Sequence, residues 1–123
     1  MAQGRGKIMI LEDDPPIRQL IADILRDAGY QVVECSGAEE ALSSFASALP
    51  DLITLDLAMP SMDGFQFLRR LEESADTARI PIVVVTAVPE PFRAPLQQRV
   101  EATISKPFHL EQLLTAVGQA LGQ

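Results

Sequence analysis

Five short segments of the chain have the composition of β-strands, at residues 7–11, 31–35, 52–55, 80–85 and 102–105. The first is a continuous apolar run, and the fourth is the richest in β-branched residues. A run that is apolar on both faces is typical of a parallel strand that helices cover on either side. The pattern therefore predicts a buried parallel sheet.

Between the predicted strands, apolar residues repeat at intervals of three and four. This spacing predicts amphipathic helices at residues 17–28, 38–45 and 110–121, and one that starts at residue 65 and ends around residues 73–76. Pro15 and Pro16 suit the entry to the first helix, where a missing N–H costs nothing, and Gly29 suits the position just after its end. Ser36 with Glu39 fits a capping box at the start of the second helix.

The segment that should hold a further helix, the fourth in chain order, is rich in proline. Pro89, Pro91 and Pro95 fall within seven positions of the chain. Proline in a helix interior costs roughly 3 kcal/mol, because it lacks an N–H and clashes with the preceding turn. We therefore predict a short or irregular fourth helix of at most two turns, at residues 95–99.

Strand and helix thus alternate five times, and the chain shows no internal repeat, low-complexity segment or linker. This order predicts an α/β domain whose right-handed crossovers place helices on both faces of a parallel sheet. The natural arrangement is a doubly wound five-stranded sheet with strand order 2-1-3-4-5 and five helices. Strands 1 and 3 are then neighbours at the switch point, where ligands bind beyond the carboxyl ends of the strands.

Composition and charge narrow the class of protein. The 123 residues suffice for one domain, and the net charge of −7 argues against direct binding to nucleic acid or to an anionic membrane. The only cysteine is Cys35, so no internal disulfide can form. No apolar run approaches the roughly 20 residues that span a bilayer, and the N-terminus lacks the apolar core of a signal peptide. A cytoplasmic location is expected.

Polar residues follow four of the five predicted strands. Glu12 and Asp13 follow the first strand, Asp56 the third, Thr86 ends the fourth, and Lys106 follows the fifth. The carboxyl ends of parallel strands share one edge of the sheet, so these side chains should meet there. Neighbouring carboxylates stay ionised only with a cation among them, and hard oxygen ligands suit Mg²⁺. Together with a hydroxyl and an ammonium, they predict a phosphoryl-transfer site with a carboxylate as nucleophile.

With these residues in this order, the sequence resembles a response regulator receiver domain over residues 7–121, with flexible termini at 1–6 and 122–123. The motifs that carry the resemblance are Glu12-Asp13, Asp56 with residues 59–64, Thr86-Ala87 and Lys106-Pro107-Phe108. The resemblance implies the flavodoxin-like form of the doubly wound fold. It also implies a cis peptide bond between Lys106 and Pro107.

In function, the resemblance implies a two-component switch or relay that catalyses its own phosphorylation and turns over no external substrate. Asp56 would accept a phosphoryl group from a histidine kinase or phosphotransfer protein, and Thr86 and Lys106 would contact that group. Asp13, Asp56 and the backbone carbonyl of Ala58 would bind Mg²⁺ directly, and Glu12 through water. A monomer or weak dimer is expected, with a downstream protein partner that the sequence does not name.

Two departures from the family pattern leave an alternative open. Thr103 stands where receivers usually carry an aromatic residue that turns inward when the phosphoryl group is bound. The stretch from Thr86 to Lys106 is also shorter than usual and rich in proline, in a region that commonly forms the output surface. Both features suit a phosphorylation-independent interaction module.

Two further questions arise from single positions in the sequence. A phosphohydrolase of the haloacid dehalogenase type would need a second aspartate two residues after Asp56, where this chain has Ala58. The chain also stops two residues after Leu121, where the last helix should finish. It is therefore either a single-domain regulator or a receiver taken from a longer protein.

Overall fold

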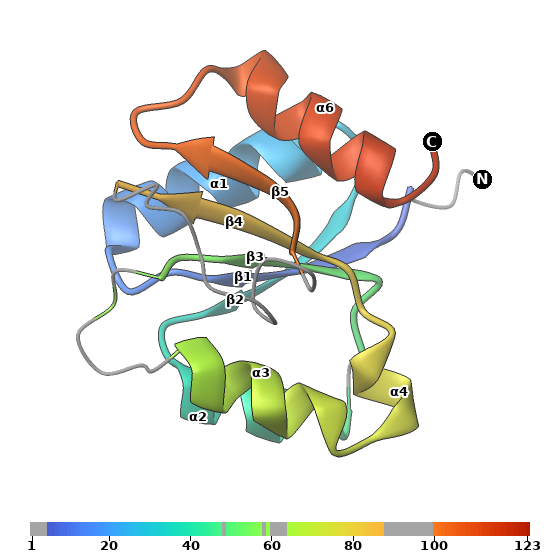
Figure 1. Cartoon of the computed structure of the whole chain (residues 1–123). Helices are drawn as coiled ribbons and strands as arrows, with labels where there is room; N and C mark the ends of the chain where they lie inside the picture. The colour runs from blue at the N-terminus through green and yellow to red at the C-terminus, as the bar shows by residue number, and fades with distance from the viewer. Residues whose placement is uncertain (1–4, 48, 58, 60–63, 88–99) are drawn as a thin grey trace.

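A computed structural model describes residues 5–47, 49–57, 59, 64–87 and 100–123. Its five parallel strands form one sheet in the order β2-β1-β3-β4-β5 (Figure 1), which confirms the predicted fold. The strands are β1 (Lys7–Leu11), β2 (Gln31–Cys35), β3 (Leu52–Leu55), β4 (Ile82–Thr86) and β5 (Val100–Ser105).

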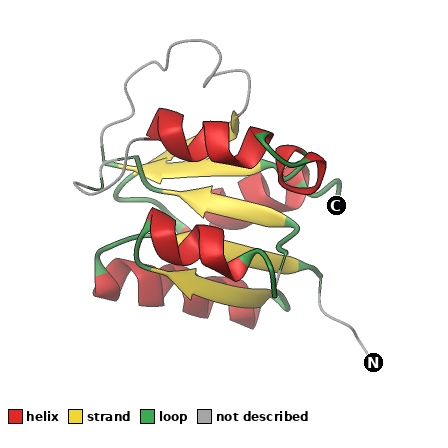
Figure 2. Cartoon of the chain, turned by 90° about the horizontal axis from the view of Figure 1, so that it is seen from below, coloured by secondary structure: helices red, strands yellow, loops and turns green. Residues whose placement is uncertain are grey.

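Helices cover both faces of this sheet, with α1 and α6 on one side and α2 and α3 on the other (Figures 1 and 2). The helices are α1 (Pro15–Asp27), α2 (Ala38–Ser44), α3 (Gly64–Glu72), α4 (Ala75–Ala78) and α6 (Leu110–Ala120). The short helix α4 was not predicted; Ser74 caps it by accepting a hydrogen bond from the backbone N–H of Asp76. The helix predicted at residues 95–99 lies outside the described residues.

Each face of the sheet has its own hydrophobic core. In β1, Met9 and Leu11 face the core beneath α2 and α3, whereas Ile8 and Ile10 face the core beneath α1 and α6. All four side chains are at most 1% exposed. This two-sided burial explains why the strand is an uninterrupted apolar run rather than an alternating one.

Helix α1 has the flanking residues that the sequence indicated, although it runs over Pro15–Asp27 rather than 17–28. Pro15 and Pro16 occupy its first positions, and Gly29, just beyond its end, has φ of 99°, a left-handed conformation that favours glycine. The backbone N–H of Tyr30 then bonds to the carbonyl of Leu25, which closes the turn into β2.

The predicted capping box of Ser36 with Glu39 is wrong. The N-cap of α2 is Gly37, and Ser36 donates from its backbone N–H (2.8 Å) and its hydroxyl (3.1 Å) to the carboxylate of Glu40. The helix starts one residue later than a box would need, so Glu40 rather than Glu39 turns back toward Ser36. These hydrogen bonds, led by the backbone one, lower the pKa of the Glu40 carboxyl.

Replacing Glu40 with glutamine is therefore expected to destabilise the fold by about 0.5–1 kcal/mol at neutral pH. Because the folded pKa of Glu40 is lowered, its contribution is complete above the unfolded pKa and disappears as pH falls through the folded pKa. Urea unfolding at several pH values measures the difference. Glu39→Gln is the matched control, and an equal loss of stability in both variants would contradict the assignment.

The described ends of the chain meet at the edge opposite the polar residues. Tyr30 donates its hydroxyl to the Gln123 side chain (2.9 Å), whose amide donates to the carbonyl of Arg5 (2.7 Å). The Arg5 guanidinium stacks over the Tyr30 ring. The domain limits at residues 7 and 121 stay a prediction.

Among the described residues, no helix has the length and apolar character to cross a bilayer.

Candidate functional site

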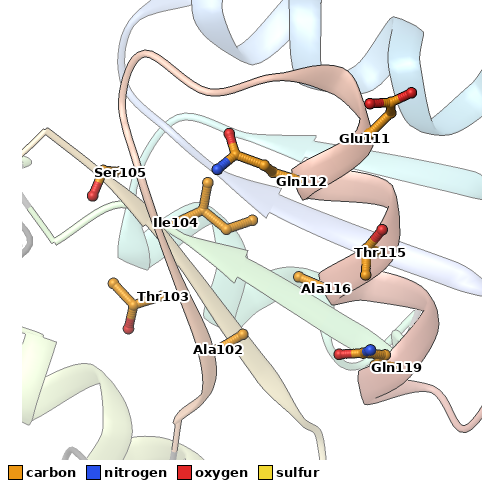
Figure 3. A pocket seen from close by; sticks show the side chains of 9 residues that line it. All are labelled: Ala102, Thr103, Ile104, Ser105, Glu111, Gln112, Thr115, Ala116 and Gln119. Carbon is orange, nitrogen blue, oxygen red and sulfur yellow. The ribbon is translucent and has the colours of Figure 1, made fainter.

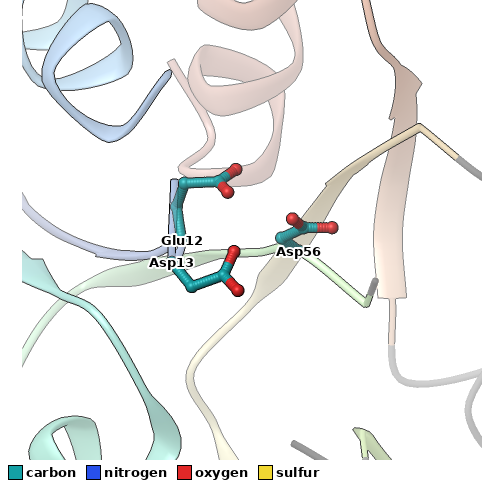
Figure 4. A group of neighbouring side chains, drawn as sticks. All are labelled: Glu12, Asp13 and Asp56. Atoms are coloured by element: carbon teal, nitrogen blue, oxygen red, sulfur yellow. The ribbon is translucent and has the colours of Figure 1, made fainter. Parts of the chain in front are cut away.

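Three carboxylates converge at the carboxyl edge of the sheet, where β1 and β3 lie side by side (Figure 4). Glu12 and Asp13 follow β1, and Asp56 follows β3. One oxygen from each lies within 4.8 Å of the others. The backbone N–H groups of Glu12 and Asp56 bond to the carbonyls of Cys35 and Leu11, each at 3.1 Å, so the sheet ladder itself fixes two of the three.

Lys106 joins two of these carboxylates. Its Nζ lies 2.6 Å from Glu12 Oε1 and 3.1 Å from Asp56 Oδ2. The residue follows β5, its backbone N–H bonds to the carbonyl of Thr86 (2.9 Å), and the peptide bond to Pro107 is cis, as predicted. The ammonium from the edge strand therefore reaches the point where β1 and β3 deliver their carboxylates.

Burial makes these charges interdependent. Glu12 is 1% and Asp56 5% exposed. Burial raises the pKa of the Glu12 carboxyl, although its hydrogen bonds from Lys106 and from the backbone of Asp14 oppose the shift. Burial also acts to lower the pKa of Lys106, but its bonds and charge interactions with the two carboxylates outweigh this effect and raise it. Lys106 is therefore an ammonium at neutral pH.

The same group of side chains suits a divalent cation. Three carboxylates face one ammonium, so the group carries a net charge of −2 when all are ionised. All its anionic ligands are hard oxygens, the type that Mg²⁺ prefers. Asp13 is exposed, so a hydrated ion can reach the group from solvent. The donor set fits Mg²⁺.

The structure describes Thr86 and Thr103 but not Ala58. Thr86 is fully buried at the end of β4, and its carbonyl accepts the hydrogen bond from Lys106. Ala58 lies outside the described residues. Thr103 is exposed and pairs with Val84 in the neighbouring strand, two residues before Thr86. No aromatic side chain occupies that position.

Arg18 contacts the site and was not predicted. It lies in the second turn of α1 and donates from Nη1 to the carbonyl oxygen of Glu12 at 3.0 Å. Its Nε also lies 3.5 Å from a carboxylate oxygen of Glu34 in β2. A side chain that reaches a backbone carbonyl leaves no motif in the sequence, so no pattern indicated this contact.

A hollow of about 530 Å³ lies between β5 and α6 (Figure 3). It is lined by Ala102, Thr103, Ile104, Ser105, Glu111, Gln112, Thr115, Ala116 and Gln119. The lining is mainly hydroxyl, amide and small apolar groups, and Glu111 is the only charged residue among the described residues that line it. Ser105 directly precedes Lys106, so this surface begins next to the carboxylate site.

Comparison with known proteins gives a consistent result. The sequence profile of the response regulator receiver domain matches residues 8–118. The phosphate regulon transcriptional regulatory protein PhoB of Escherichia coli is 32% identical over 113 residues, which are 90% of this chain and 49% of that protein. PhoB of Pseudomonas aeruginosa is 34% identical over 116 residues, 93% of this chain and 51% of that protein. The chain thus spans about half the length of these curated relatives.

Solved structures agree with the sequence comparison. The chemotaxis response regulator CheY4 of Vibrio cholerae superposes with a TM-score of 0.83 at 30% identity, covering 94% of this chain and 98% of that one. The receiver domain of the sensor histidine kinase PA1611 from Pseudomonas aeruginosa, which has a magnesium ion in its active-site cleft, gives a TM-score of 0.83 at 26% identity. That match covers 96% of this chain and 98% of the other.

Proposed function

The chain belongs to the response regulator receiver domain family, and on that premise we propose that Asp56 accepts a phosphoryl group in a Mg²⁺-dependent reaction. The donor is a phosphohistidine on a histidine kinase or phosphotransfer protein. The observation that carries the proposal is the contact of Lys106 with buried Asp56 inside a group of three carboxylates.

In this reaction an oxygen of Asp56 forms a bond to phosphorus while the bond from phosphorus to the histidine nitrogen of the donor breaks. The freed imidazole keeps the electron pair of that bond. Lys106 places a positive charge beside the attacking oxygen, and Thr86 is assigned a hydrogen bond to the phosphoryl group. Bound Mg²⁺ supplies further positive charge for the phosphoryl oxygens. Glu12, Asp13, Asp56 and the carbonyl of Ala58 are the groups assigned to hold it, Glu12 through water.

The product is a switch or relay state rather than the result of turnover on an external substrate. Ser105 lines the hollow between β5 and α6; Lys106 follows it in the chain, and Thr86 pairs with it across the β4–β5 ladder, so a change at either residue lies next to that surface. We assign the downstream protein partner to this side of the domain. Thr103 is exposed there, so the readout would not depend on an aromatic side chain turning inward.

That exposed Thr103 also favours the second candidate, an interaction module that works without phosphorylation. The two functions differ in what Asp56 does for partner binding. A module predicts equal partner affinity for the wild type and Asp56→Asn, whereas a switch predicts that phosphorylated wild type differs from both.

The direct test is to incubate the chain with Mg²⁺ and acetyl phosphate and measure its intact mass. One added phosphoryl group per chain is expected, and peptide mapping should locate it on the segment that contains Asp56. Addition of EDTA before acetyl phosphate should prevent it. A folded, Mg²⁺-supplemented chain that gains no mass would contradict the proposal.

A further inference from the structure

The loop that carries two of the three carboxylates is anchored through its backbone. Glu12 donates its N–H to the carbonyl of Cys35 (3.1 Å), and its own carbonyl accepts from Arg18 Nη1 (3.0 Å). The first bond belongs to the sheet ladder, whereas the second comes from a helix. Because the Glu12 carbonyl is part of the peptide that leads into Asp13, the Arg18 contact restrains the orientation of that peptide.

Arg18 is itself held in place by Glu34. Its Nε lies 3.5 Å from Glu34 Oε1, while Arg26, two turns further along α1, contacts the other oxygen of the same carboxylate at 3.2 Å. The Arg18 and Glu34 side chains are 21% and 26% exposed, so both are largely screened from solvent. Glu34 therefore fixes one end of the guanidinium while the other end donates to Glu12.

This restraint matters because the carboxylates repel one another. Three carboxylates close together push the loop after β1 toward conformations that separate them, and only Glu12 and Asp56 contact Lys106. Asp13 is exposed and has no ion pair among the described residues, so its position depends on the backbone that carries it. A hydrogen bond to the preceding carbonyl opposes the separation without occupying a carboxylate oxygen.

We propose that Arg18, held by Glu34, is a positioning residue that keeps Asp13 beside Glu12 and Asp56 and so increases the affinity of the site for Mg²⁺. The inference rests on the proposed function, since it concerns the cation site used there. Arg18 does not touch the cation ligands' oxygens; it acts through the peptide between Glu12 and Asp13. Groups that orient metal ligands typically change metal affinity by about 10–100-fold.

The sign of the effect separates positioning from simple charge. Arg18 is a cation near a cation site, so its removal by charge alone would make Mg²⁺ bind more tightly. Positioning requires the opposite, weaker binding in Arg18→Ala. Arg26→Ala is the matched control, because it removes the same charge and the other ion pair of Glu34 but contacts no group of the carboxylate site.

Isothermal titration calorimetry with MgCl₂ on the full chain measures the affinities. Arg18→Ala is expected to bind Mg²⁺ about tenfold more weakly than the wild type. Arg26→Ala should bind as the wild type does or slightly more tightly, and Asp13→Asn provides the reference for a damaged site. Arg18→Lys, which can reach the carbonyl or Glu34 but lacks the planar fork to hold both, should recover part of the affinity.

Thermal unfolding in EDTA checks that each variant is folded, and if Arg18→Ala is not, Arg18→Lys, which keeps the charge, carries the test with the same expected direction. Affinity equal to or higher than that of the wild type in the folded Arg18 variants overturns the inference, as does a wild type that binds no Mg²⁺. Acetyl phosphate labelling of the wild type, measured alongside, tests the proposed function separately: a labelled wild type with unchanged Arg18→Ala affinity refutes only the positioning role.

Discussion

Asp56→Asn is expected to lose all labelling by acetyl phosphate. The amide has nearly the shape of the carboxylate, but its oxygen carries no formal charge and is a poor nucleophile, so no bond to phosphorus forms. Asp56 is 5% exposed and follows β3, whereas the other two carboxylates of the site follow β1. Intact mass after incubation with Mg²⁺ and acetyl phosphate measures the loss.

Asp51→Asn is the control for this variant. Asp51 accepts a hydrogen bond from the backbone N–H of Lys7 (2.8 Å) at the opposite edge of the sheet, so its replacement should leave labelling unchanged. Far-ultraviolet circular dichroism should show both variants folded. Labelling of Asp56→Asn equal to that of the wild type would move the phosphoryl acceptor to another side chain, with exposed Asp13 the nearest candidate.

The fold and the convergence of the site were predictable because both follow from the topology. A two-sided apolar run such as β1 requires helices on both faces of the sheet, and short parallel crossovers leave few strand orders. Once β1 and β3 are neighbours, Glu12 and Asp56 must lie together, since each directly follows its strand. The order of the strands alone therefore predicts that these carboxylates lie together, without any knowledge of side-chain geometry.

The sequence did not indicate two kinds of contact: those made by a long side chain to a distant backbone atom, and those that change when a helix starts one residue later than predicted. The partner of Ser36 was misassigned because α2 starts after Gly37, and a shift of one residue exchanges Glu39 for Glu40. Arg18 was missed because its partner is a backbone carbonyl six residues earlier, which any residue type provides. Local spacing predicts which edge a residue reaches but not which atom it contacts there.

The proposed chemistry of the site and the stability of the fold make opposite demands on the buried carboxylates. An apolar group in place of Asp56 or Glu12 would remove a buried charge, and buried ionic groups are often no more stabilising than apolar ones of the same size. The chain instead keeps two buried carboxylates around one ammonium and a third at the surface. This excess of negative charge destabilises the fold, and a cation that bound among the carboxylates of the folded chain alone would offset it and raise stability.

Lys106→Met is expected to slow phosphoryl transfer to Asp56 by about 10²–10³-fold, the usual effect of removing a group that stabilises transition-state charge. Methionine keeps most of the length of the aliphatic chain but removes the ammonium that lies 2.6 Å from Glu12 and 3.1 Å from Asp56. Without Mg²⁺ the variant should also be about 3 kcal/mol less stable, because two buried carboxylates lose their shared cation. Rates of labelling by acetyl phosphate and urea unfolding in EDTA measure the two effects.

Lys7→Met is the matched control, since Lys7 is the only other lysine and begins β1 at the opposite edge of the sheet. It should change neither quantity appreciably. Added Mg²⁺ should restore more stability to Lys106→Met than to the wild type, because the site of the variant carries one more negative charge that the ion can neutralise. If Lys106→Met transfers at the wild-type rate, the ammonium serves only to balance the buried carboxylates. If it loses no stability in EDTA, the ammonium does not stabilise the two buried carboxylates in the folded chain.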